Sequence, residues 1–75
     1  MKLFIKTINN VKTPIEDVDP EWTVARLKKY IEEKMEISAV QQRLSYNGEP
    51  LADVFRIKTI PDGAVIYLIR QFQLF

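Results

Sequence analysis

The chain has 75 residues, of which 47% are hydrophobic and 28% charged, and its net charge is +1. Residues 1–75 are therefore expected to form a single domain. The balanced charge gives no overall attraction to nucleic acid or membrane surfaces, and no apolar run approaches the ~20 residues of a membrane span. The chain has no cysteine and no histidine, which excludes most metal sites and nucleophile arrangements. We expect no enzyme activity, no catalytic residue, no metal and no cofactor.

Residues 1–8 alternate between two faces, which predicts a β-strand. One face carries Met1, Leu3, Ile5 and Thr7, and the other carries Lys2, Phe4, Lys6 and Ile8. Asn9-Asn10 fits a two-residue turn because asparagine adopts the left-handed region more readily than most residues, and residues 11–15 then predict a second strand. Pro14 lacks an N–H and places this strand at a sheet edge. The alternation breaks at Glu16-Asp17, which indicates a bulge.

A helix is predicted from the residues that follow Thr23, whose hydroxyl can cap the first turn. Trp22 can pack on Leu27 as a hydrophobic staple, and we expect this role rather than one in recognition. The apolar stripe of the helix consists of Val24, Leu27, Ile31 and Met35. No glycine ends the helix, so Glu36 is expected to take the left-handed conformation at some cost in strain.

Residues 41–51 predict a β-hairpin around Asn47-Gly48, the strongest short-range signal for a type I′ turn. Alternation places Leu44 and Tyr46 on the core side of its first strand, so Ser45 faces outward.

Residues 52–60 predict an irregular stretch with one short helical turn, anchored by Phe55 or Ile57 and by Ile60. The last strand is predicted over residues 64–70. Nearly all of its residues are apolar, which indicates a central strand covered on both faces. Within it, Ile66 and Leu68 are expected to face the core, and Tyr67 and Ile69 to face outward.

The predicted order is strand, strand, helix, strand, strand, turn, strand, which is an α+β fold with a mixed sheet of four to five strands on one helix. Four segments carry a resemblance to a known family: residues 1–7, Thr23-Val24, Gln41-Gln42-Arg43-Leu44 with Asn47-Gly48, and residues 66–69. Over essentially its whole length the chain resembles ubiquitin and the ubiquitin-like domains, which share the β-grasp fold. Fold by itself does not give function.

The resemblance implies a partner-binding patch on the outer face of the sheet. Its residues here are Phe4, Ile8, Arg43, Ser45, Gly48, Tyr67 and Ile69. The family has a large aliphatic anchor where Ser45 stands, and such a side chain contributes roughly 1.5–3 kcal/mol when fully buried. We therefore expect weak or absent binding to ordinary ubiquitin-binding helices.

The resemblance also implies covalent conjugation, which needs two glycines at the C-terminus. This chain closes with Gln71-Phe72-Gln73-Leu74-Phe75, so we expect that it is not conjugated as it stands. We expect a monomer, with weak self-association through Phe72, Leu74 and Phe75 as the alternative.

The leading interpretation is a non-conjugatable protein-interaction module. The alternatives are a designed or diverged ubiquitin-fold protein that has kept no partner, and a modifier with a processed terminus. We expect a weakly bound protein partner of the ubiquitin-receptor type or none, with no nucleic acid and no membrane. The expected location is cytoplasmic or nuclear for a natural protein. Lys2, Lys6 and Lys12 in the first hairpin, and the acidic residues 16–21, are interpreted as solvated edges.

Overall fold

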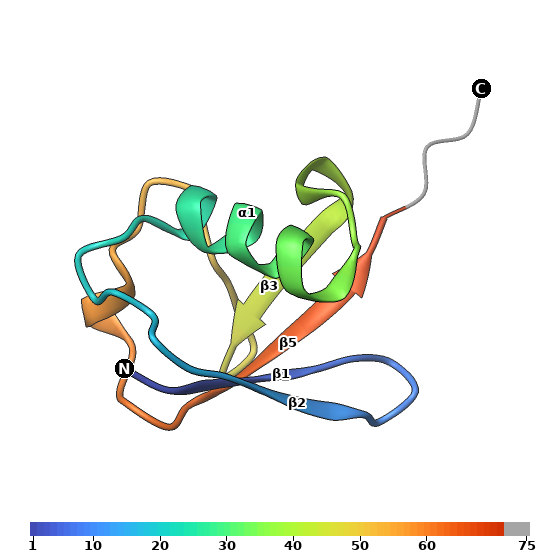
Figure 1. Cartoon of the computed structure of the whole chain (residues 1–75), viewed down its shortest axis with the longest axis horizontal. Coiled ribbons are helices and arrows are strands. Elements are labelled where there is room, and N and C mark those ends of the chain that lie inside the picture. Colours follow the sequence, from blue (N-terminus) through green and yellow to red (C-terminus); the bar gives the residue numbers. More distant parts are fainter. Residues whose placement is uncertain (72–75) are drawn as a thin grey trace.

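The structure, a computed structural model, describes residues 1–71. Its elements follow the predicted order (Figure 1). They are β1 (Leu3–Lys6), β2 (Lys12–Ile15), α1 (Val24–Met35), η1 (Ala39–Gln41), β3 (Gln42–Tyr46), β4 (Glu49–Pro50), η2 (Ile57–Thr59) and β5 (Val65–Arg70). The short helical turn predicted within residues 52–60 is the 3₁₀ helix η2, and a second 3₁₀ helix, η1, is added before β3. The strands form one sheet in the order β2-β1-β5-β3-β4, and α1 lies across one face of it. The expected mixed sheet on one helix is confirmed.

Alternation along the strands decides which side chains reach the helix. Leu3 and Ile5 of β1, Leu44 of β3, and Ile66 and Leu68 of β5 are buried against the helix. The α1 side of the core is made by the apolar stripe Val24, Leu27 and Ile31, with Met35 packed at its margin. β1 and β5 run parallel, while the other neighbouring pairs are antiparallel. The remaining residues of each strand form an outer face, and no helix within residues 1–71 lies over it (Figure 1).

Both ends of α1 are capped as the sequence predicts. The Thr23 hydroxyl accepts a hydrogen bond from the backbone N–H of Arg26 at 3.3 Å. At the other end Glu36 has φ 59° and ψ 36°, and its N–H donates to the carbonyl of Glu32. A non-glycine residue held there carries strain of roughly 1–2 kcal/mol. Trp22 is half-buried on the core, with its ring edge-on to Tyr30 at 5.3 Å between centroids.

The turn of the first hairpin differs from the prediction. The N–H of Asn10 donates to the carbonyl of Thr7 at 2.9 Å, so Ile8 and Asn9 are the central residues of the turn. Asn10 follows with φ 68°, and β2 begins at Lys12. The left-handed conformation of Asn10 adds one residue to the loop, which lifts Ile8 out of the strand.

The other local predictions are largely confirmed. Pro14 lies on the edge strand β2, and Asp17 takes φ 61° directly after the alternation breaks. Asn47 and Gly48 have φ 57° and 82°, the positive values that a type I′ turn requires. Of the two proposed anchors in the irregular stretch, Ile57 is fully buried whereas Phe55 is exposed.

The prediction that β5 is covered on both faces is wrong. β5 is central, since β1 and β3 flank it, but Tyr67 and Ile69 are 46% and 58% exposed. An apolar strand indicates burial on both faces only where a second layer covers the sheet. This sheet has one helical layer, so the apolar residues on the outer side of β5 meet solvent.

Candidate functional site

The outer face of β3 and β5 brings the candidate residues into register. Ser45 lies directly opposite Tyr67, and Arg43 lies directly opposite Ile69. Leu44 and Leu68 form the intervening pair and point into the core. Two neighbouring pairs of side chains therefore stand on the solvent side, as alternation predicts.

Five of the seven predicted residues line one shallow hollow, which we call the Tyr67 hollow. Its volume is about 520 Å³, and the residues that matter for its chemistry are Lys6, Ile8, Ser45, Gly48, Tyr67 and Ile69. Ile8 is 95% exposed at the tip of the first hairpin, beside the apolar side chains of β5. The hairpin tip and the outer side of β5 therefore form one exposed apolar surface.

Gly48 contributes open space to this hollow. A Cβ atom built on Gly48 would meet nothing within 4 Å, and its φ of 82° suits glycine rather than other residues. The backbone at this turn is therefore open to close approach by a partner. Ser45 is half-buried beside it and offers a small polar side chain between Tyr67 and Ile69.

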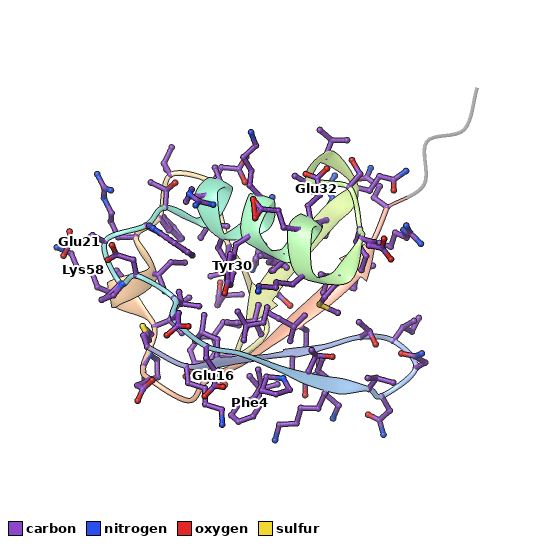
Figure 2. All side chains as sticks on the ribbon, in the orientation of Figure 1. Phe4, Glu16, Glu21, Tyr30, Glu32 and Lys58 are labelled. Carbon is purple, nitrogen blue, oxygen red and sulfur yellow. The ribbon has the colours of Figure 1, made fainter. Side chains whose placement is uncertain are left out.

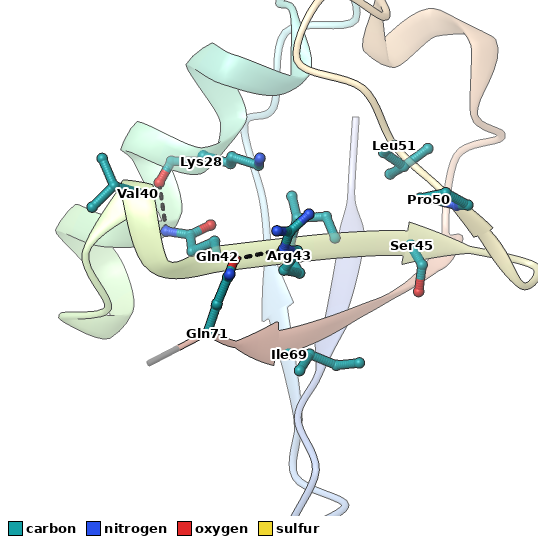
Figure 3. A pocket seen from close by; sticks show the side chains of 10 residues that line it. Lys28, Val40, Gln42, Arg43, Ser45, Pro50, Leu51, Ile69 and Gln71 are labelled. Atoms are coloured by element: carbon teal, nitrogen blue, oxygen red, sulfur yellow. Dashed lines mark hydrogen bonds between the residues drawn. The ribbon is translucent and has the colours of Figure 1, made fainter. Parts of the chain in front are cut away.

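Arg43 lies outside the Tyr67 hollow and lines an adjacent one of about 340 Å³, together with Val40, Ser45, Leu51 and Ile69. Figure 3 shows this second hollow, in which the Arg43 Nε–H donates to Gln71 Oε1 at 2.7 Å. Ile69 and Ser45 line both hollows, so they separate Arg43 from the aromatic part of the surface. Arg43 therefore lies at the edge of the Tyr67 hollow and not within it.

Gln42 holds the inner wall of the second hollow in place. Its side chain is almost fully buried, and Nε2 donates to the carbonyl of Lys28 at 2.8 Å (Figure 3). The same Nε2 donates to the carbonyl of Ile37 at 3.0 Å. These bonds tie β3 to α1 and to the segment after it. Within residues 1–71, the Oε1 of Gln42 is buried without a hydrogen-bond partner.

Phe4 is on the outer face but lines neither hollow. It lies half-buried on β1, on the side of the sheet away from α1 (Figure 2). The ammonium groups of Lys2 and Lys12 stand 5.1 Å and 4.7 Å from its ring centroid. The Lys6 ammonium stands 5.6 Å from the ring centroid of Tyr67. Alternation assigns these lysines to the same face as Phe4, but their contacts with the rings were not foreseen.

The described residues were compared with the requirements of a metal site and of a membrane span. Within residues 1–71, no group of three or more histidine, cysteine, aspartate or glutamate side chains is placed to hold a metal ion. Over the same residues no helix has the length and apolar character needed to cross a bilayer.

Comparisons with known proteins identify relatives over most of the chain. The sequence model of a family described as "Ubiquitin family" matches residues 3–72. The chain is 34% identical over 71 residues to "Ubiquitin-like protein 1" of Schizosaccharomyces pombe, an alignment that covers 92% of this chain and 90% of that protein. It is 35% identical over 71 residues to "NEDD8-like protein RUB3" of Arabidopsis thaliana, with the same two coverages.

Proposed function

The chain belongs to the ubiquitin family, and we propose that it acts as a protein-interaction module that binds its partners without a covalent bond. Its fold is the β-grasp of that family. The proposed contact surface is the outer face of the sheet, centred on the Tyr67 hollow. The observation that carries the proposal is the cluster of exposed apolar side chains Ile8, Tyr67 and Ile69 around an open glycine turn.

Binding through this surface is expected to be weak. The Tyr67 hollow is shallow, and Ser45 occupies the position at which the family resemblance calls for a large aliphatic anchor. A few buried anchors carry most of the energy of an interface, and serine buries little apolar area. Tyr67 and Ile69 are the anchors that remain in β5, and Ile8 supplies a third from the hairpin tip.

Covalent conjugation is the competing function within this family. Conjugation needs two glycines at the C-terminus, and residues 71–75 contain none. Residues 72–75 lie outside those that the structure describes, so the expected self-association through Phe72, Leu74 and Phe75 stays a prediction. Incubation of the 75-residue chain with a ubiquitin-family activating enzyme and ATP tests conjugation. We expect no thioester, and a thioester on this chain would contradict the non-covalent proposal.

The proposal is tested by comparing what immobilised protein retains from cell extract. Ile69→Ser removes an exposed anchor from the outer face, and Lys29→Ser makes a matched change on the exposed side of α1. A partner that is retained by the wild type and by Lys29→Ser, and lost with Ile69→Ser, supports the proposal. A set of partners that Ile69→Ser leaves unchanged contradicts the proposal. The absence of any specific partner also contradicts it, and favours the alternative of a ubiquitin-fold protein that has kept no partner.

A further inference from the structure

The charged side chains of β1 and β2 that face outward are all positive. Lys6 lies directly opposite Lys12 across the two strands, and Phe4 lies opposite Pro14 beside them. Lys2 shares this face by alternation. Like charges directly opposite each other in a sheet destabilise it, so the pairing of Lys6 with Lys12 has no structural advantage of its own.

Lys6 and Lys12 contact different aromatic rings. Lys12 and Lys2 both stand over Phe4, while Lys6 stands over Tyr67. A ring face attracts a cation but leaves its charge uncompensated. We call Lys2, Lys6 and Lys12 the lysine cluster.

Within the described residues, no carboxylate forms an ion pair with this cluster. The ion pairs found in residues 1–71 join Lys28 to Asp53 and Lys58 to Glu21, and neither involves the outer face. The carboxylate of Asp62 lies beside the cluster and accepts a hydrogen bond from the backbone N–H of Lys2 at 2.7 Å. The cluster is therefore a positive surface next to an apolar one.

We propose that the outer face selects an acidic peptide segment of its partner, with the carboxylates on the lysine cluster and a neighbouring apolar side chain in the Tyr67 hollow. Lys6 connects the two parts because it both lines the Tyr67 hollow and stands over the Tyr67 ring. A segment that follows β1 can therefore meet the charges and the apolar side chains together. This inference rests on the proposed function and adds the chemistry of the partner.

Nucleic acid fits the same charges less well. Sheets that bind single strands stack bases on free aromatic faces. Here lysine ammoniums stand over both Phe4 and Tyr67, and the chain as a whole has a net charge of only +1. An acidic peptide needs no ring face, because it meets the ammonium groups themselves.

The test titrates the ¹⁵N-labelled 75-residue chain with two short peptides that share the same apolar residues. One carries aspartate and glutamate, and the other carries asparagine and glutamine at the same places. We expect the acidic peptide to bind at least about fivefold more tightly, with shifts at Phe4, Lys12 and Tyr67. Its affinity should fall as salt rises from about 0.05 to about 0.3 M, since exposed charges are screened over that range.

The double variant Lys2→Gln/Lys12→Gln should weaken acidic-peptide binding by roughly three- to tenfold, the effect expected for two exposed ion pairs. Lys29→Gln on α1 is the matched control and should leave the affinity unchanged. Both variants alter exposed residues, and a thermal melt of each checks that the fold is retained.

The inference would be overturned by no acidic-peptide binding at millimolar concentration, by equal effects of Lys2→Gln/Lys12→Gln and Lys29→Gln, or by tighter binding of a single-stranded oligonucleotide. Equal binding of both peptides, with shifts centred on Tyr67 and Ile69, would also overturn it but would leave the proposed function standing. Failure of the proposed function itself would be seen in the other experiment, because Ile69→Ser would then leave the set of proteins retained from cell extract unchanged.

Discussion

Ser45 lies directly opposite Tyr67 in the antiparallel pairing of β3 with β5, and both side chains are on the face of the sheet away from α1. The pair lines the Tyr67 hollow together with the exposed side chains of Ile8 and Ile69. A small hydroxyl next to a large ring leaves the surface hollow rather than filled. This relationship sets the expected strength of binding.

Ser45→Ile should strengthen binding to a helical ubiquitin-binding peptide by roughly tenfold, because a newly buried aliphatic side chain contributes about 1.5–3 kcal/mol when it is fully enclosed. A heteronuclear NMR titration measures the change. Ala25→Ile adds an aliphatic side chain to the exposed side of α1 and should have no effect. Micromolar binding by the wild type, centred on Ser45, would contradict the account.

Ile66→Ala and Ile69→Ala should separate the two faces of β5. Ile66 is fully buried, so its truncation should lower the free energy of unfolding by about 2–5 kcal/mol. Ile69 is 58% exposed and should change stability by less than about 1 kcal/mol. Urea denaturation of both variants measures the difference, and comparable losses would mean that β5 is covered on both sides.

Glu36→Gly should stabilise the protein by about 0.5–1 kcal/mol. Glycine adopts the φ of 59° at the end of α1 without strain, and part of that gain is offset by its freedom in the unfolded chain. Glu33→Gly, on the exposed side of the same helix, should instead destabilise by about 1 kcal/mol. Thermal melts distinguish the two, and losses of the same sign would argue against a left-handed Glu36.

Gln42→Ala should destabilise the protein by about 1–3 kcal/mol, because it removes the donor shared by the buried carbonyls of Lys28 and Ile37. Gln41→Ala is the control at the neighbouring position, where the side chain is only half-buried, and should stay within about 0.5 kcal/mol. Urea denaturation measures both. If Gln42→Ala and Gln41→Ala lower the free energy of unfolding equally, the hydrogen bonds of the Gln42 amide do not stabilise the protein.

Local patterns were sufficient to predict much of this fold. Alternation identified the inward positions of β3 and β5 and separated the two faces of β1, and the hydroxyl of Thr23 marked the start of α1. The Asn47-Gly48 turn was predicted because its two residues tolerate positive φ, which is a property of each residue alone. These features depend on near neighbours in the sequence.

The remaining features depend on neighbours that are distant in the sequence. Alternation gives the face of Tyr67 but does not say that Ser45 lies opposite it or that β5 lies between β1 and β3. It also missed the extra residue in the first turn, which moved Ile8 from the strand to the hairpin tip. Phe4 was grouped with Tyr67, yet the lysines around Phe4 set it apart from the Tyr67 hollow.

The central claim, that partners bind the outer face of the sheet, is tested most directly by site-specific photo-cross-linking in cell extract. A photoreactive phenylalanine analogue replaces Ile69 in one sample and Glu33, on the exposed side of α1, in another. The account predicts a discrete protein adduct from position 69 that disappears when Tyr67→Ser is added, and no such adduct from position 33. The same adducts from both positions, or adducts from position 33 alone, would contradict it.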